Sequence, residues 1–171
     1  MLELFSRITT FVFDVDGVLT DGTLFVFDNG EQVRRMNIKD GYALQLAIKK
    51  GYRVAIFSGS ISEAVVSRLK KLGITDIFMN VKDKKSAVVN YLQQHDISWK
   101  EILFMGDDIP DYTVMKEAAL PCAPSDAVPE IKQIAKYISS FPGGKGCVRD
   151  VIEKVLKLKD DWDLDVSIPS K

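Results

Sequence analysis

The chain has 171 residues, of which 23 are Lys or Arg and 24 are Asp or Glu, so its formal net charge at pH 7 is −1. This balance excludes the basic surface with which proteins hold nucleic acids or anionic membranes. Hydrophobic residues make up 46% and charged residues 27%, as in an ordinary globular protein, and no apolar stretch is long enough to span a bilayer. We therefore expect residues 1–171 to form a single cytoplasmic domain with no nucleic-acid and no membrane partner.

Short apolar runs alternate along the chain with segments of helical period. The predicted strands are residues 8–13, 52–57, 74–79, 101–106 and 118–123. The predicted helices are residues 41–50, 61–72, 84–95 and 109–117. Because the apolar runs have no polar face, they suit parallel strands that are covered on both sides. The pattern predicts an α/β fold, a single doubly wound, Rossmann-like parallel sheet with helices on both faces.

Two segments break this alternation. Residues 23–36 hold two β-prone runs around Asp28-Asn29-Gly30, which predicts a β-hairpin inserted after the first strand. The second is the C-terminal part, where a Gly-rich turn at residues 143–146 precedes a helix ending near Leu158 and a polar tail at residues 159–171. We expect this tail to be mobile or bound to a partner, so that its removal changes turnover more than stability.

Polar side chains follow four of the predicted strands, at the sheet edge where open α/β sheets bind ligands. In chain order they are Asp14 and Asp16, Ser58 and Gly59, Lys84, and Asp107 with Asp108 and Asp111. We expect all of them to converge on one pocket.

The carboxylates in this set favour a divalent metal site. If the first strand stays extended, Asp14 and Asp16 lie on one side, and Asp107 arrives from a neighbouring strand. Two carboxylates about 4 Å apart repel by about 4 kcal/mol at an effective dielectric of 20, so several together need a cation. Oxygen ligands without His or Cys favour Mg²⁺. We predict Asp14, Asp16 and Asp107 as metal ligands, with Asp108 and Asp111 orienting metal waters or Lys84.

The same residues suit phosphoryl transfer. Asp14 is the predicted nucleophile, and Asp16 the general acid and base. Three groups would hold the phosphate oxygens: the hydroxyl of Ser58, the backbone of Gly59 and the ammonium of Lys84.

Simpler interpretations remain for each motif. Asp14 and Asp16 alone suit a helix cap or turn, and so do Ser58 with Gly59, Asp108 and Asp111. Lys84 lies in the run VKDKK, which is typical of a solvated surface. The glycines of GGKG lack the GK[ST] of a Walker motif and suit a helix entry turn or an intersubunit contact.

The order of the motifs points to a family. DVDGVLTDG, FSG, Lys84 and GDDIPD, between residues 11 and 111, resemble the four signature motifs of the haloacid dehalogenase superfamily. The short spacing between Asp16 and Ser58 leaves no room for a large cap domain, so the chain resembles a capless member.

Two further stretches narrow the resemblance. NGEQVRRMNIKDGYALQLA and GGKGCVRDVIEKVL are similar to the 3-deoxy-D-manno-octulosonate 8-phosphate phosphatases of bacterial lipopolysaccharide synthesis. The resemblance implies a Mg²⁺-dependent phosphoric monoester hydrolase, working through an aspartyl phosphate. It also implies a homotetramer in which the hairpin and tail of one subunit close the neighbour's site. The substrate contacts that it implies are Asn37, Ile38, Lys39, Asp40, Gly41, Arg68 and Lys84.

The chain departs from this family at Lys39, Gln45 and Ser60, where the family often has arginine, and only Arg68 keeps its guanidinium. A phosphatase for a nine-carbon ketodeoxy sugar acid phosphate is therefore the alternative substrate assignment. Two other classes are a phospho-accepting receiver domain and a non-catalytic oligomerisation module. The intact acids disfavour the module, and acids on the first and fourth strands disfavour a receiver.

Overall fold

The computed structural model describes residues 1–169 and confirms the predicted α/β fold. Its main sheet has six strands, every neighbouring pair parallel, in the order β5-β4-β1-β6-β7-β8. The strands are β1 (Thr10–Phe13), β4 (Arg53–Phe57), β5 (Asp76–Phe78), β6 (Ile102–Met105), β7 (Leu120–Ala123) and β8 (Tyr137–Ile138). Because β1 lies at the centre, its carboxyl end opens between those of β4 and β6.

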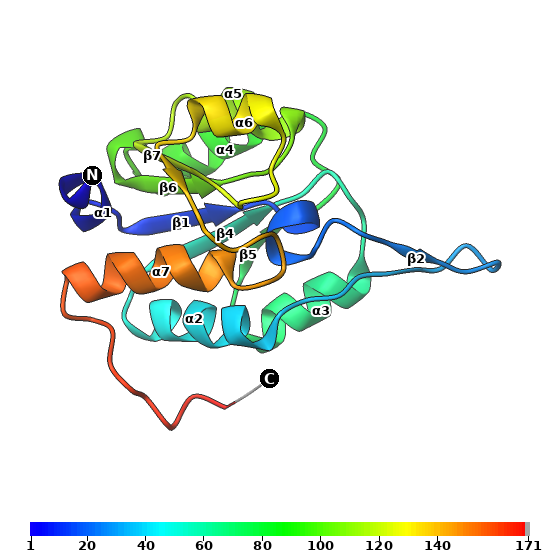
Figure 1. The fold of residues 1–171 in the computed structure, drawn as a ribbon, viewed down its shortest axis with the longest axis horizontal. Coiled ribbons are helices and arrows are strands. Elements are labelled where there is room, and N and C mark those ends of the chain that lie inside the picture. Colours follow the sequence, from blue (N-terminus) through cyan, green and yellow to red (C-terminus); the bar gives the residue numbers. More distant parts are fainter. Residues whose placement is uncertain (170–171) are drawn as a thin grey trace.

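Helices cover both faces of the sheet and enclose two hydrophobic cores (Figure 1). On one face pack α1 (Leu2–Ser6), α2 (Ile38–Lys49), α3 (Glu63–Lys71) and α7 (Cys147–Leu158). On the other pack α4 (Lys84–Gln94), α5 (Tyr112–Met115) and α6 (Pro129–Ile134). Alternate residues of β1 serve the two cores, Phe11 and Phe13 one and Val12 the other. This alternation explains why the strand is apolar on both faces.

Three short elements were not predicted from the sequence, namely α1, α6 and β8. Each is six residues or fewer, too short to show a hydrophobic period. The predicted helix over 109–117 is also divided, because a 3-10 turn at Ile109–Asp111 precedes α5. The five predicted strands are all present in the sheet, and β8 adds a sixth at its edge beside β7.

The hairpin is present as predicted, formed by β2 (Phe25–Val26) and β3 (Gln32–Val33) in antiparallel pairing. Its turn is closed by the Glu31 amide, which donates to the Asn29 side chain, and Gly30 has a positive φ of 83°. The hairpin projects from the carboxyl-end side of the sheet (Figure 1). Its outer apolar side chains are exposed: Leu24 at 43%, Phe25 at 60%, Val26 at 69% and Phe27 at 51%.

The described part of the tail packs on its own chain, along α2. The Trp162 ring lies edge-on to Tyr42 of α2, at a centroid distance of 6.0 Å. Lys50 of α2 pairs with Asp163 at 2.8 Å, and Lys49 pairs with Asp165. Aromatic contact and ion pairs therefore hold the tail along the outer side of α2, where Figure 1 shows it.

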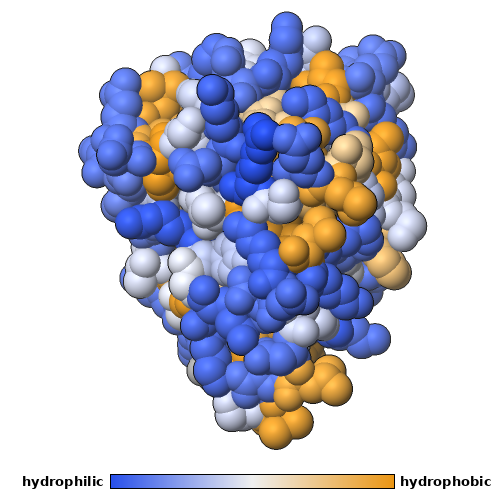
Figure 2. Space-filling view, turned by 90° about the vertical axis from the view of Figure 1, so that its left-hand side faces the viewer, coloured by the Kyte–Doolittle hydropathy of each residue, from blue (hydrophilic) through white to orange (hydrophobic). Residues whose placement is uncertain are grey.

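The opposite end of the molecule, at the amino ends of the strands, has a mostly hydrophilic surface with hydrophobic residues in separate groups (Figure 2). Within residues 1–169, no helix has the length and apolar character needed to cross a membrane. Both cysteines, Cys122 and Cys147, are buried free thiols.

Candidate active site

Asp14 lies where β1 ends and the chain turns. Its amide continues the sheet by donating to the carbonyl of Met105, at 3.1 Å, but residues Val15–Leu19 then form a helical turn. Gly17 inside that turn has a φ of 85°, and a Cβ there would overlap the Asp107 carboxylate. The extended chain that would place Asp16 beside Asp14 therefore does not continue, and only glycine fits at position 17.

The Gly-rich loop at residues 143–146 supports this turn from behind. The amide of Gly144 donates to the carbonyl of Val18 at 2.9 Å, and the side-chain amide of Asn37 donates to the carbonyl of Gly144 at 3.3 Å. A Cβ on Gly143 would overlap the backbone of Gly17. The loop also leads into α7, as a helix entry turn does. It is thus a brace within the same chain.

The end of β6 carries a second group of acids. Gly106 leaves room for the Asp111 carboxylate, which a Cβ at this position would overlap. One Asp111 oxygen accepts from the amide of Asp107 at 3.1 Å. Asp108 accepts from the amide of Ile109 at 2.7 Å, which makes it the cap of the 3-10 turn. Asp111 is fully buried, so its orientation is fixed by the core.

Lys84, the first residue of α4, connects the two groups of acids. Its ammonium is 2.8 Å from the Asp14 carboxylate and 2.6 Å from that of Asp111, and the residue is 6% exposed. Lys85, in contrast, lies at the surface in an ion pair with Glu117. Of Lys84 and Lys85, the structure therefore buries Lys84, which is also the lysine that the order of the motifs selects.

Carboxylate oxygens of Asp14, Asp107 and Asp111 lie within 4.8 Å of one another. Burial, with repulsion from Asp111, raises the pKa of Asp14 to about 7. Burial, with repulsion from Asp111 and Asp14, raises the pKa of Asp107 to about 8. Burial also raises the pKa of Asp111. One buried oxygen of Asp107 has no hydrogen-bond partner. Such a set of charged oxygens fits a hard divalent cation such as Mg²⁺.

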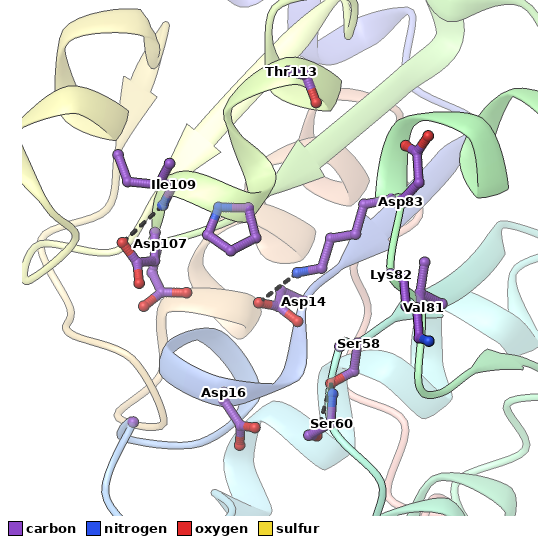
Figure 3. Close-up of a pocket in the computed structure, with 15 residues that line it drawn as sticks. Asp14, Asp16, Ser58, Ser60, Val81, Lys82, Asp83, Asp107, Ile109 and Thr113 are labelled. Carbon is purple, nitrogen blue, oxygen red and sulfur yellow. Dashed lines mark hydrogen bonds and ion pairs between the residues drawn. The ribbon is translucent and has the colours of Figure 1, made fainter.

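The Asp16 side chain lies outside this cluster. Arg34, directly after β3, holds it with two hydrogen bonds, from Nε to Oδ1 at 2.7 Å and from Nη2 to Oδ2 at 3.2 Å. Figure 3 shows Asp16 beyond the helical turn, apart from Asp14 and Asp107. The side-chain oxygens that gather are therefore those of Asp14, Asp107 and Asp111, and the Asp16 carboxylate is not among them. The sequence pattern predicts only a supporting role for Asp111 and does not single out Arg34.

Ser58 follows β4 and is buried. Its hydroxyl lies 2.9 Å from that of Ser60 and accepts from the Ser60 amide at 3.2 Å. The N-cap of α3 is Ser62, so Ser58 does not cap that helix. Ser58, Gly59 and Ser60 all line the cavity in Figure 3, which leaves their polar groups beside Asp14.

A single cavity of about 670 Å³ is lined by Lys84, the Ser58 loop and four of the acids, Asp14, Asp16, Asp107 and Asp108. Asp111 is fully buried and does not line it. Residues 37–41 and Arg68 are not among its lining. The Asp40 carboxylate is buried and accepts from the Arg149 amide at 2.7 Å, so it joins α2 to α7 and does not face the cavity. Arg68 instead lines a separate hollow beside the hairpin, together with Arg34. Of the predicted substrate contacts, only Gly59 and Lys84 therefore meet in this cavity.

Comparisons with known proteins agree with this geometry. Residues 71–148 match the haloacid dehalogenase-like hydrolase family. The 3-deoxy-D-manno-octulosonate 8-phosphate phosphatase of Escherichia coli strain K12 is 34% identical over 158 residues, which are 92% of this chain and 84% of that protein.

Solved structures are equally similar. The phosphatase of the same name from Yersinia pestis superposes with a TM-score of 0.91 at 31% identity, over 94% of this chain and 86% of that one. The Moraxella catarrhalis phosphatase, in complex with a magnesium ion, a phosphate ion and a KDO molecule, has a TM-score of 0.90 at 31% identity, over 94% of this chain and 92% of that one.

Proposed function

Because the chain belongs to the 3-deoxy-D-manno-octulosonate 8-phosphate phosphatase family of haloacid dehalogenase-like hydrolases, we propose that it cleaves that sugar acid phosphate into the free sugar acid and phosphate. The chain is a Mg²⁺-dependent phosphatase that hydrolyses phosphate monoesters. The observation that carries the proposal is the cluster of Asp14, Lys84, Asp107 and Asp111, of which the first three line the cavity and Asp111 is buried beside them. This family membership removes the receiver domain and the silent oligomerisation module as alternatives.

The metal is assigned to Asp14, Asp107 and Asp111. Bound Mg²⁺ neutralises their charge and that of the phosphate oxygens. Lys84 balances Asp14 and Asp111 in the metal-free protein, which keeps their oxygens in place. The Asp16 carboxylate joins the metal ligands only if its two hydrogen bonds to Arg34 open. Asp108, as the cap of the 3-10 turn, supports the loop and does not contact the ion.

Asp14 is the nucleophile in this proposal. One of its oxygens accepts from the Val15 amide at 2.6 Å and the other is paired with Lys84, so the carboxylate is held in one orientation. Attack of a carboxylate oxygen on phosphorus forms the aspartyl phosphate and breaks the bond to the sugar oxygen. Asp16 gives a proton to that oxygen. It then takes one from the water that hydrolyses the aspartyl phosphate and regenerates Asp14.

Three groups around Asp14 are placed to bind the transferred phosphoryl oxygens. They are the Ser58 hydroxyl, the Gly59 amide and the Lys84 ammonium, all at the cavity surface. Hydrogen bonds and a point charge fixed in advance stabilise the transition state without reorganisation. The phosphate therefore sits between β4, the start of α4 and the Asp14 turn.

Recognition of the sugar acid is assigned to two subunits. The exposed apolar hairpin residues Leu24, Phe25, Val26 and Phe27 support its packing on another copy of this chain. We assign the family's homotetramer to this protein, with the hairpin of one subunit, beside which Arg68 lies, closing a neighbour's cavity. Gln45 donates to the carbonyls of Gly41 and Pro169. Its amide thereby ties residue 41 to the tail. A cytoplasmic location belongs to the same proposal.

Phosphate release tests this function directly. We expect Mg²⁺-dependent release to be fastest from 3-deoxy-D-manno-octulosonate 8-phosphate and to stop when the metal is chelated. The two comparison substrates are a nine-carbon ketodeoxy sugar acid phosphate and a neutral sugar phosphate of similar length. Faster turnover of the nine-carbon compound would transfer the assignment to it. Ser60, Gln45 and Lys39 motivate this comparison, because none of them offers the arginine fork that the family often has at these positions. Equal turnover of the neutral sugar phosphate would contradict recognition of a carboxylate.

A further inference from the structure

Arg34 is unlike its neighbours on the hairpin. The side chain of Arg34 is only 5% exposed, whereas Val33 beside it is 40% exposed and Val26 across the hairpin is 69% exposed. The antiparallel bridge between Thr20 and Met36 fixes the base of the hairpin just beyond it. The fold therefore turns one guanidinium inward at the point where the hairpin leaves the sheet.

The inward guanidinium reaches Asp16 in a fork geometry. Nε and Nη2 donate to different oxygens of the same carboxylate, at 2.7 Å and 3.2 Å. A bidentate pair of this kind fixes the plane of the carboxylate as well as its position. Asp16 itself lies in a turn with non-helical backbone angles and its side chain is 36% exposed. Packing alone leaves this side chain room to rotate, and Arg34 removes that freedom.

We propose that Arg34 is a positioning residue, which aims Asp16 at the oxygen of the leaving sugar. The proposal rests on the proposed function, in which Asp16 is the general acid. Proton transfer requires the donor within hydrogen-bond distance of the leaving oxygen, and an acid that samples several orientations is in place for only part of the time. Arg34 also keeps the Asp16 carboxylate away from Asp14 and Asp107, where it would become a further metal ligand.

Substrates with different leaving groups can distinguish the positioning role of Arg34 from other roles. A sugar alkoxide needs a proton as it departs, whereas the phenolate of p-nitrophenyl phosphate departs without one. The value of kcat/KM reports the steps up to formation of the aspartyl phosphate, so later hydrolysis does not obscure the comparison. The test therefore uses three substrates: the sugar acid phosphate, p-nitrophenyl phosphate and a neutral sugar phosphate. The neutral sugar phosphate has an alkoxide leaving group and no carboxylate.

Arg34→Met is the test variant, because methionine keeps much of the buried length without the fork. We expect kcat/KM to fall about 10- to 100-fold for both sugar phosphates and to stay within about threefold for p-nitrophenyl phosphate. In protein that already carries Asp16→Asn, adding Arg34→Met should not lower kcat/KM any further, because the two residues act as one unit.

Arg35→Ala is the matched control. Arg35 is the next residue, its side chain is 63% exposed, and it pairs with Asp21 outside the cavity. Its removal should leave all three kcat/KM values unchanged. Thermal unfolding of each variant shows whether the fold is intact.

Three results would overturn the positioning role. An equal loss with all three substrates would make Arg34 a structural or phosphate-binding residue. A loss confined to the sugar acid phosphate would make it a carboxylate-binding residue. No loss at all would remove it from the reaction. A failure of the proposed function looks different, because wild-type protein would then release no phosphate from the sugar acid phosphate.

Discussion

The active site consists of two halves that are built differently. The buried half is Asp14, Lys84, Asp107 and Asp111, of which Asp107 is half-buried and the other three are buried. The hairpin half is Asp16 and Arg34, joined by a contact between a turn and a projecting hairpin. Burial in the first half concentrates charge that a metal must balance. Partial exposure in the second leaves a carboxylate whose direction depends on one guanidinium.

The two halves differ in the property that matters for their chemistry: charge in the buried half, and side-chain orientation in the hairpin half. In the buried half, burial and repulsion between the carboxylates raise the pKa values of Asp14 and Asp107. We propose that this half supplies the nucleophile and the metal site. In the hairpin half the chemistry is proton transfer, for which geometry matters more than burial. Variants in the buried half should affect every substrate, and variants in the hairpin half should affect only substrates with a poor leaving group.

The largest effect is expected for Asp14→Asn, which removes the nucleophile. Turnover of every phosphate ester should fall by about 10⁴-fold or more, because the amide cannot form an aspartyl phosphate. Phosphate release measures the loss, and circular dichroism checks the fold. Asp108→Asn is the control, because its side chain caps a turn and an amide oxygen can do the same. Substantial turnover by Asp14→Asn would disprove the covalent route.

A smaller effect is expected for Lys84→Met. Loss of the ammonium should lower kcat/KM about 10²- to 10³-fold with aryl and alkyl phosphates alike, because a phosphate-binding charge is gone. The metal-free protein should also lose about 3 kcal/mol of unfolding free energy at pH 8, because Asp14 and Asp111 lose their buried partner.

Lys85→Met is the control for Lys84, since its ion pair with Glu117 is exposed and should contribute little. Denaturant unfolding of both variants measures the difference. Equal loss of stability in the two would show that the buried half has no special dependence on its lysine.

The third prediction concerns pH. The pKa values of Asp14, about 7, and Asp107, about 8, lie above that of an unfolded aspartate, so the folded metal-free protein binds more protons. Stability is then greatest at low pH and is lost as pH rises through these values. We expect the melting temperature of the metal-free protein to fall by roughly 5–10 °C between pH 5 and pH 8.

Saturating Mg²⁺ should remove most of that slope, because it binds the ionised carboxylates of the folded state. Part of the slope should remain between about pH 4 and pH 6. Burial raises the pKa of Asp40 to about 6, and Asp40 is not one of the proposed metal ligands, so Mg²⁺ does not remove its contribution. A slope that Mg²⁺ does not alter would contradict a metal site in the buried half.

The smallest effect is expected at the tail, which touches neither half. Truncation after Asp160 removes the Trp162 contact with Tyr42 and the ion pairs of Asp163 and Asp165. We expect a loss of about 1–2 kcal/mol in unfolding free energy, reduced at high salt because the ion pairs are exposed.

Turnover of the truncated protein per folded molecule should change little, in contrast to the expectation from composition alone. Calorimetry and phosphate release measure the two quantities. A large loss of turnover with unchanged stability would show that the tail acts on a neighbour's site.

The sequence was sufficient for the buried half because local rules determine it. Apolar runs predict parallel strands, and the residue after each run must emerge at the carboxyl edge. Asp14, Ser58 and Asp107 could be found in this way. Lys84 needed the additional information of motif order, since nothing local distinguishes it from Lys85.

The hairpin half could not be predicted from the sequence in the same way. The period of two predicts Asp16 beside Asp14, but Gly17 takes a positive φ and starts a turn. The partner of Asp16 lies 18 residues away, and no local pattern marks one arginine of Arg34-Arg35 as buried. The packing of the tail could not be predicted for a related reason, because its aspartates pair with lysines more than a hundred residues earlier. Contacts between distant segments depend on the assembled fold.

The central claim is that Asp14 becomes phosphorylated during turnover. Protein mixed with Mg²⁺ and 3-deoxy-D-manno-octulosonate 8-phosphate, quenched in acid within milliseconds, can be digested and weighed by mass spectrometry. The account predicts that the peptide containing Asp14 gains the mass of one phosphoryl group, and that Asp14→Asn protein gains none. Phosphate release with no phosphorylated peptide at any quench time, or with the phosphoryl group on another residue, would contradict it.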